Sequence, residues 1–151
     1  MQGSCLCGTV RYEIDRLDAP ITHCHCLTCQ KAHAAAFATT AGVLRQHFRW
    51  LAGQQTLGSY ESSPGKLRHF CPKCGSHLMA EWTAQDAVIL RVASLDTPLP
   101  SKPVIHIWTS HQAAFFDGQH ERGPFNRLVQ RGTVQRLDEA GVDHTHTQAL
   151  F

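Results

Sequence analysis

The segment Cys71-Pro72-Lys73-Cys74-Gly75 carries two cysteines at the spacing of a zinc knuckle, followed by a glycine that permits the tight turn. A second pair, Cys5-Leu6-Cys7, comes shortly before a predicted strand near the N-terminus. Four thiolates complete a closed tetrahedral zinc site, with zinc–sulfur distances of about 2.3 Å. We therefore expect one structural zinc to join these two pairs and to staple the first strand to the middle of the domain.

The remaining three cysteines of the chain lie within six residues, in Cys24-His25-Cys26-Leu27-Thr28-Cys29. This segment joins a predicted strand end to the start of a short predicted helix, and a loop so compact can hold three sulfurs on one ion. A zinc with three protein ligands keeps its fourth position open for water or substrate. Seven cysteines thus predict one closed zinc site and one open, reactive zinc site.

Two other interpretations of the three-cysteine segment stay open. A histidine could serve as fourth ligand and close the site, and the spacing excludes none of these candidates: His25, His33, His69, His77 and His106. Alternatively, the three cysteines could carry no metal, because three ligands hold zinc more weakly than four.

Composition and length predict one globular domain with a real core. The chain has 151 residues, of which 42% are hydrophobic and 17% charged. It contains no run of about 18 apolar residues that could span a membrane, and its start lacks the pattern of a signal peptide. We expect a cytoplasmic protein, where clustered thiols bind metal more often than they form disulfides.

The charge gives no sign of a nucleic-acid partner. The formal net charge is +2 with every thiol counted as neutral, but zinc binds thiolates. Removing seven protons and adding two zinc ions changes this net charge to −1. Because no lysine-rich or arginine-rich run is present, we expect no nucleic-acid binding.

Short alternating segments separated by turn residues dominate the chain and predict an all-β sandwich or open barrel. One short helix is expected over residues 28–36, where alanine, glutamine and lysine favour helix. Residues 1–130 are expected to form the domain and residues 131–151 a polar tail, in which His144 and His146 are more typical of a solvated segment than of a metal site. The predicted strands are residues 10–14, 37–44, 47–51, 56–61, 66–70, 77–82, 87–92 and 104–108.

Four segments in order resemble the glutathione-dependent formaldehyde-activating family, also called the GFA or CENP-V/GFA domain family. The resemblance covers about residues 3–127 and includes all seven cysteines. The segments are Ser4-Cys5-Leu6-Cys7-Gly8-Thr9-Val10-Arg11-Tyr12, Cys24-His25-Cys26-Leu27-Thr28-Cys29-Gln30-Lys31, Phe70-Cys71-Pro72-Lys73-Cys74-Gly75-Ser76 and His106-Ile107-Trp108. The family usually has a Ser-Gly pair after the three cysteines, whereas this chain has His33-Ala34.

The resemblance implies a zinc-stapled β fold of the Mss4-like type. It implies a structural zinc on Cys5, Cys7, Cys71 and Cys74, and a second zinc on the catalytic cysteines Cys24, Cys26 and Cys29. It also implies a carbon–sulfur lyase-type reaction run in reverse, in which a small-molecule thiol, glutathione, adds to an aldehyde, formaldehyde, to give S-(hydroxymethyl)glutathione. Which thiol and aldehyde this chain uses does not follow from the family.

Residues around the three cysteines suggest supporting roles. His25 and His33 are the nearest candidates for a proton shuttle, although His25 is more simply expected to face outward and His33 to be exposed on the helix. Lys31, Arg68 or Arg91 could pair with the carboxylates of glutathione. Core packing is the expected role of the aromatic candidates Trp82, Trp108, Phe115 and Phe116, ahead of lining a pocket.

Two further functions are compatible with a zinc-stapled β domain: a non-catalytic binding module and a glutathione carrier. A docking scaffold needs only the four-cysteine site, so the three-cysteine segment favours thiol chemistry. A methionine sulfoxide reductase of related fold would need a nucleophilic cysteine late in the domain, and no cysteine follows Cys74.

Overall fold

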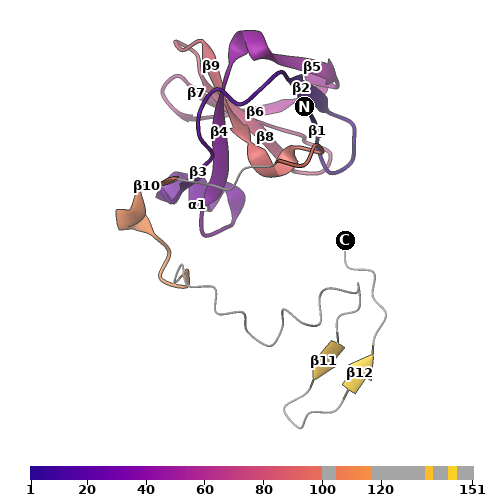
Figure 1. Cartoon of the computed structure of the whole chain (residues 1–151), viewed down its shortest axis with the longest axis vertical. Helices are drawn as coiled ribbons and strands as arrows, with labels where there is room; N and C mark the ends of the chain where they lie inside the picture. Colours follow the sequence, from indigo (N-terminus) through magenta and orange to yellow (C-terminus); the bar gives the residue numbers. More distant parts are fainter. Residues whose placement is uncertain (100–104, 117–134, 138–142, 146–151) are drawn as a thin grey trace. The chain divides into compact units, whose positions relative to one another are not determined.

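The computed structural model describes residues 1–99, 105–116, 135–137 and 143–145 of the chain (Figure 1). Two compact units divide the chain, Met1–Phe116 and Asp117–Phe151. In the second unit, strands β11 (Gln135–Leu137) and β12 (Asp143–Thr145) pair antiparallel. Within the described residues, the helices are all too short or too polar to cross a bilayer.

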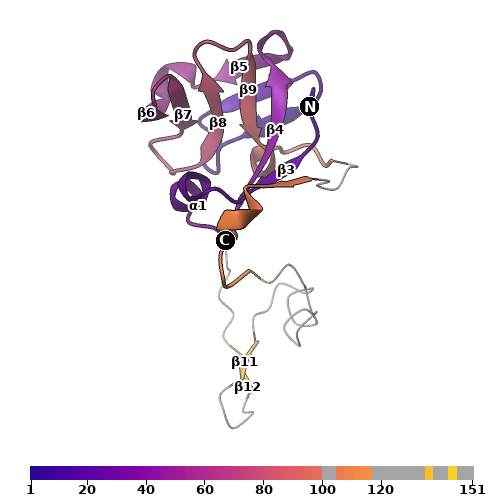
Figure 2. The same cartoon turned by 90° about the vertical axis from the view of Figure 1, so that its left-hand side faces the viewer.

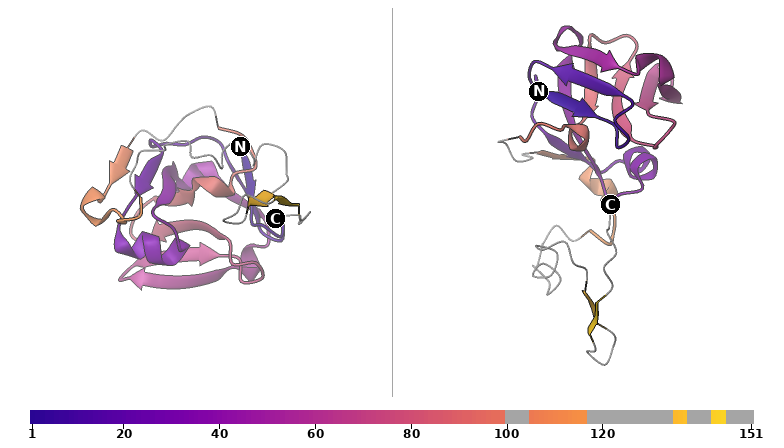
Figure 3. Two further views of the ribbon diagram at one scale, coloured as in Figure 1. Left: turned by 90° about the horizontal axis from the view of Figure 1, so that it is seen from below. Right: turned by 90° about the vertical axis from the view of Figure 1, so that its right-hand side faces the viewer.

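The first unit contains two sheets whose strands pair mostly antiparallel. The small sheet has the order β1 (Gln2–Ser4), β2 (Arg11–Ile14) and β5 (Phe48–Ala52). The large sheet, seen beside it in Figures 2 and 3, has seven strands in an open order. That order is β10 (Ile105–Ile107), β3 (Thr22–Cys24), β4 (Ala38–Leu44), β9 (Ala87–Arg91), β8 (His77–Trp82), β7 (Lys66–Phe70) and β6 (Gly58–Ser63).

All pairs in the large sheet are antiparallel except the pair of β10 with β3. Helix α1 (Leu27–His33) follows β3 directly and contains one buried residue, Cys29. Short 3₁₀ turns connect the remaining elements, at Arg45–His47, Gln54–Thr56, Val92–Ser94 and Thr109–His111.

The apolar core lies between the two sheets. Tyr12 and Ile14 of β2 are fully buried and belong to one cluster with Val43 of β4 and with Val88 and Leu90 of β9. Alternation along the strands explains this set, because residues two apart in a strand face the same side of a sheet. The core therefore uses one face of the large sheet and leaves its other face for different side chains.

That other face carries cationic and thiol side chains. In the strand register, Thr40 of β4 lies opposite Arg91 of β9 and Thr22 of β3. Arg68 of β7 lies opposite Ala80 of β8. Residues two apart in a strand share a face, so Cys24 lies on the same face as Thr22, and Lys66 on the same face as Arg68. Strand pairing thus brings Cys24, Lys66, Arg68 and Arg91 to one face, although they are far apart in sequence.

The predicted all-β architecture with one short helix is confirmed, and both sheets are open. The Mss4-like type and the domain boundary at residue 130 stay predictions. Strands Lys66–Phe70 and His77–Trp82 have the predicted bounds. The helix ends three residues earlier than predicted, because Ala34 takes a left-handed conformation with φ of 48°. His144 lies on β12, and His146 lies outside the described residues.

We predict that Leu90→Ala lowers the free energy of unfolding by about 2–5 kcal/mol, because it removes buried methyl groups from the core between the sheets. The matched control is Leu51→Ala on β5, where the side chain is 45% exposed, and its effect should stay within about 0.5 kcal/mol. Urea unfolding at constant zinc measures both values. Equal losses in the two variants would contradict the placement of the core.

Candidate metal centres and the adjoining pocket

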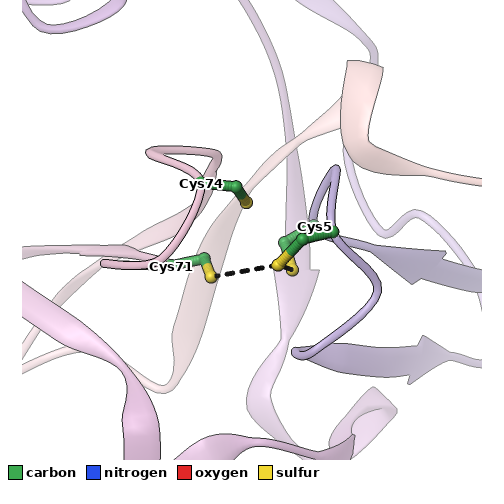
Figure 4. A group of neighbouring side chains, drawn as sticks. Cys5, Cys71 and Cys74 are labelled. Atoms are coloured by element: carbon green, nitrogen blue, oxygen red, sulfur yellow. Dashed lines mark hydrogen bonds between the residues drawn. The ribbon is translucent and has the colours of Figure 1, made fainter.

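The first cysteine group has the geometry of a closed zinc site. The sulfurs of Cys5, Cys7, Cys71 and Cys74 lie within 4.8 Å of one another. The Cys5–Cys7 sulfur distance is 3.5 Å and the Cys7–Cys71 distance is 3.8 Å. Four sulfurs placed tetrahedrally at about 2.3 Å from one ion would be about 3.8 Å apart. This thiol group therefore fits zinc, and Figure 4 shows Cys5, Cys71 and Cys74 directed toward one another.

Two tight turns present these four sulfurs. Gly8 and Gly75 have positive φ values of 70° and 75°, and their amides donate to the carbonyl oxygens of Cys5 and Cys71 at 2.8 Å. The Leu6 amide donates to the hydroxyl of Ser76 at 3.0 Å, which links one turn to the other. One turn joins β1 to β2 of the small sheet and the other joins β7 to β8 of the large sheet. A metal here would tie the two sheets together.

Hydroxyl groups support thiolate character in this first group. The Ser76 hydroxyl lies 3.3 Å from the Cys74 sulfur, and this contact, together with hydrogen bonds from the Ser76 backbone and from Cys7, lowers the pKa of Cys74 to about 5. The Thr9 hydroxyl lowers the pKa of Cys7 in the same way. Burial acts in the opposite direction on Cys71 and raises its pKa to about 11. A cation is therefore needed to hold all four groups as thiolates at neutral pH.

The second group consists of Cys24, Cys26 and Cys29, whose sulfurs also lie within 4.8 Å of one another. Cys24 ends strand β3, which lies between β4 and β10. Cys26 is the N-cap of α1, and its sulfur accepts from the Cys29 amide at 3.4 Å. The end of β3, the N-cap of α1 and the first turn of that helix thus bring the three sulfurs together. We call them the three-thiol cluster.

The thiols of the three-thiol cluster differ in how readily they ionise. Burial raises the pKa of the Cys24 thiol to about 12. Burial also acts to raise the pKa of Cys26, but hydrogen bonds from the backbone and side chain of Cys29 outweigh it, so this pKa lies below its ordinary value. The Arg68 guanidinium Nη2 lies 3.9 Å from the Cys29 sulfur. The donor set suits zinc, and an arginine already faces one of its sulfurs.

The three-thiol cluster opens into a pocket of about 380 Å³. The strands of the large sheet form its floor, and the segment around β10 and the following 3₁₀ turn contributes one wall. Its lining residues are Cys24, Cys26, Thr28, Cys29, Thr40, Ser62, Ser63, Lys66, Arg68, Trp82, Ile89, Arg91, Ile107, Trp108 and His111. We call this space the thiol pocket.

The structure selects among the cations proposed from sequence. Arg68 and Arg91 line the thiol pocket, whereas Lys31 lines only an adjoining pocket, which shares Arg68 with the thiol pocket. Sequence reasoning missed Lys66 and His111. Lys66 stands two residues before Arg68 in a predicted strand, so alternation could have placed both on one face. His111 follows β10 in an irregular segment, and no sequence pattern placed it at the site.

The expectation of core packing for the late aromatic residues is wrong at two positions. Trp108 is 60% exposed and Phe115 is 82% exposed. Trp82 and Trp108 both line the thiol pocket. Phe116 packs against the rings of Phe37 and His25. Trp108, Phe115 and Phe116 lie outside the core cluster because they follow β10, the edge strand of the large sheet, and Trp82 lies at the end of β8.

The histidines next to the cysteines do not face outward. His25 is fully buried, and its Nε2 lies 2.9 Å from Nδ1 of His106. His33 is half-buried against His77, with ring centroids 4.7 Å apart, and burial lowers the pKa of His33 to about 3. Among the described residues, no histidine joins the three-thiol cluster as a fourth ligand group. The expectations that His25 faces outward and that His33 is exposed are therefore wrong.

Gln30 connects the helix to the opposite wall of the thiol pocket. Its side-chain amide donates to the carbonyl oxygens of His25 at 2.5 Å and of His111 at 2.6 Å. The His25 amide donates in turn to the Ile107 carbonyl at 3.0 Å. These bonds fix the segment that carries Trp108 and His111 against the cysteine loop, so the pocket has a defined wall.

The chain is similar to known proteins in both sequence and fold. The family model described as glutathione-dependent formaldehyde-activating enzyme matches residues 1–111. A Halomonas elongata protein named "Putative glutathione-dependent formaldehyde-activating enzyme" is 29% identical over 116 residues, which cover 68% of this chain and 70% of that protein. A crystal structure of a Rhodobacter sphaeroides protein is similar in fold, with a TM-score of 0.59 and 24% identity, covering 70% of this chain and 99% of that one.

We predict that the two cysteine groups differ in their effect on stability. Cys71→Ser should remove one zinc per chain and lower the free energy of unfolding by about 3 kcal/mol or more, because structural zinc contributes on the order of 10 kcal/mol in small zinc domains. Cys26→Ser should also lower zinc content, yet cost less stability, because its cluster lies outside the core between the sheets. Native mass spectrometry and urea unfolding measure both. Equal destabilisation would refute this division of roles.

Proposed function

Because this chain belongs to the glutathione-dependent formaldehyde-activating family, we propose that it joins a small-molecule thiol to an aldehyde at the three-thiol cluster. The proposed substrates are glutathione and formaldehyde, and the product is S-(hydroxymethyl)glutathione. In this direction the reaction is the reverse of a carbon–sulfur lyase reaction. The observation that carries the proposal is the opening of Cys24, Cys26 and Cys29 into a pocket large enough for a small molecule.

The three-thiol cluster is the proposed place where the substrate sulfur is held. When bound by these cysteines, zinc would supply an open coordination position at which a thiol ionises readily. Within the described residues, the group of possible metal ligands here has three members against four in the other group. That difference supports an open site beside a closed one.

The pocket's own residues supply orientation and proton handling. The substrate S–H bond breaks, a carbon–sulfur bond forms, and the carbonyl oxygen gains a proton, so one proton must move across the site. Among the described residues that line the thiol pocket, His111 is the one histidine, and we assign this proton transfer to its imidazole. His25 and His33 do not line this pocket. Trp82 and Trp108 would limit the entry of water around the reacting atoms.

A reducing compartment suits this chemistry. All seven cysteines are free thiols, and the two groups must remain reduced to bind metal. We therefore propose the cytoplasm as the site of action.

We predict that zinc-loaded protein accelerates formation of S-(hydroxymethyl)glutathione at pH 6 by about tenfold or more over buffer. At this pH a free thiol with a pKa of about 8.5 is almost wholly protonated, so a site that ionises the thiol has its largest advantage. Exchange NMR with ¹³C-formaldehyde measures the rate without a coupled enzyme. Cys26→Ser should reduce the rate to that of buffer, and His111→Gln should slow it while leaving glutathione bound.

The matched control for the histidine is His47→Gln, whose ring contacts Asp18 at 2.9 Å and does not line the thiol pocket. It should keep the wild-type rate. Glutathione binding that depends on Cys26, with no acceleration by wild-type protein, would instead favour a carrier. Absence of glutathione binding at full zinc loading would contradict the proposal and favour a binding module.

A further inference from the structure

Three cationic side chains face the thiol pocket from neighbouring parts of the large sheet. Lys66 and Arg68 come from β7 and Arg91 from β9. Arg68 is 4% exposed and Arg91 is 5% exposed, so both guanidinium groups are buried. Among the described residues that line this pocket, there is no aspartate or glutamate. The pocket therefore concentrates positive charge beside the three-thiol cluster.

The two buried arginines have donors without partners among the described residues. Nε and Nη1 of Arg68 and Nε of Arg91 are buried with no hydrogen-bond acceptor, and the buried Ser62 hydroxyl on the same pocket also lacks a partner. By contrast, the exposed Arg49 pairs with carboxylates of Glu13 and Asp15. Burial of an unpaired charge is unfavourable, and native proteins normally pair such donors. These donors thus indicate an acceptor that the described residues do not supply.

The three-thiol cluster cannot balance this charge alone. Three thiolates around one zinc carry a net charge of −1, which offsets one of the three cations and leaves two. Nη2 of Arg68 faces the Cys29 sulfur, and the Arg91 guanidinium also interacts electrostatically with the cluster. Lys66 is held by a different interaction, with its ammonium 4.7 Å from the centre of the Trp82 ring. The remaining positive charge is available to a ligand.

We propose that Arg68, Arg91 and Lys66 form a carboxylate-binding subsite beside the three-thiol cluster, so that the substrates of this protein include a small molecule bearing a carboxylate. The planar guanidinium fork binds a carboxylate through two parallel hydrogen bonds, and an ammonium adds charge without that geometry. The identity of the atoms that react beside this subsite rests on the proposed function. The binding of a carboxylate by the three cations does not depend on that function.

The position of Arg68 limits where the carboxylate is carried. Its guanidinium lies 3.9 Å from the Cys29 sulfur, so a carboxylate bound here is close to atoms reacting at the cluster. A short thiol acid would satisfy this, and so would an aldehyde with an adjacent carboxylate. The shared chemistry is a carboxylate a few bonds from the reacting sulfur or carbonyl carbon.

The test compares ligands with a carboxylate against neutral analogues of similar size. Binding to zinc-loaded protein is followed by the fluorescence of Trp82 and Trp108, which line the pocket. The thiol arm compares 3-mercaptopropionate with 3-mercaptopropionamide, and the aldehyde arm compares glyoxylate with glycolaldehyde. In at least one arm the carboxylate compound should bind about tenfold more tightly or better. The arm that shows this preference identifies which substrate carries the carboxylate.

Variants assign the preference to named residues. Arg68→Gln should reduce it to twofold or less, and Lys66→Gln should reduce it partly. Lys66 is less buried than the arginines, so Lys66→Gln still tests the carboxylate preference if Arg68→Gln fails to fold. The matched control is Arg11→Gln, an exposed arginine on β2, which should keep the full preference.

Two outcomes would overturn the subsite: equal binding of charged and neutral compounds in both arms, or a preference that survives Arg68→Gln and Lys66→Gln together. Failure of the proposed function is distinguishable from either. If Cys26→Ser leaves thiol binding unchanged while glyoxylate is still preferred and still depends on Arg68, the subsite stands and thiol chemistry at the cluster does not.

Discussion

Alternation along the strands of the large sheet is the constraint on which both the core and the site depend. In β9, Val88 and Leu90 enter the core, while Ile89 and Arg91 face the thiol pocket. A shift of one residue in register would place a buried arginine in the apolar core and expose leucine in the pocket. Core packing therefore fixes the arginine, and with it the charge beside the cysteines.

The two cysteine groups lie on different elements, and we propose a structural role for one and a chemical role for the other. The four-thiol group joins the turn after β1 to the turn after β7, so a metal there would hold the small sheet to the large one. The three-thiol cluster lies on β3 and α1 and opens into the thiol pocket. Because Cys24 and Cys29 pack in a cluster separate from the core, we expect changes there to leave the core intact.

Cysteine spacing was enough to predict both thiol groups, because ligands close in sequence must lie close in space. Strands with clean alternation, such as Lys66–Phe70 and His77–Trp82, were predicted with their bounds. The pocket could not be predicted, because strand order decides that Arg68 and Arg91 meet the cysteines, and sequence alone does not give strand order. The burial of His25 was not predicted, because its ring contacts residues distant in sequence, among them His106, 81 residues away.

Zinc-edge X-ray absorption of the loaded protein, before and after addition of glutathione, tests the central claim that the three-thiol cluster accepts a substrate thiol. Four sulfurs at one site and three at the other give an average of about three and a half sulfurs per zinc. We predict a rise to four when glutathione is added, and no rise in Cys26→Ser. An average that glutathione leaves unchanged in the wild-type protein would contradict the claim.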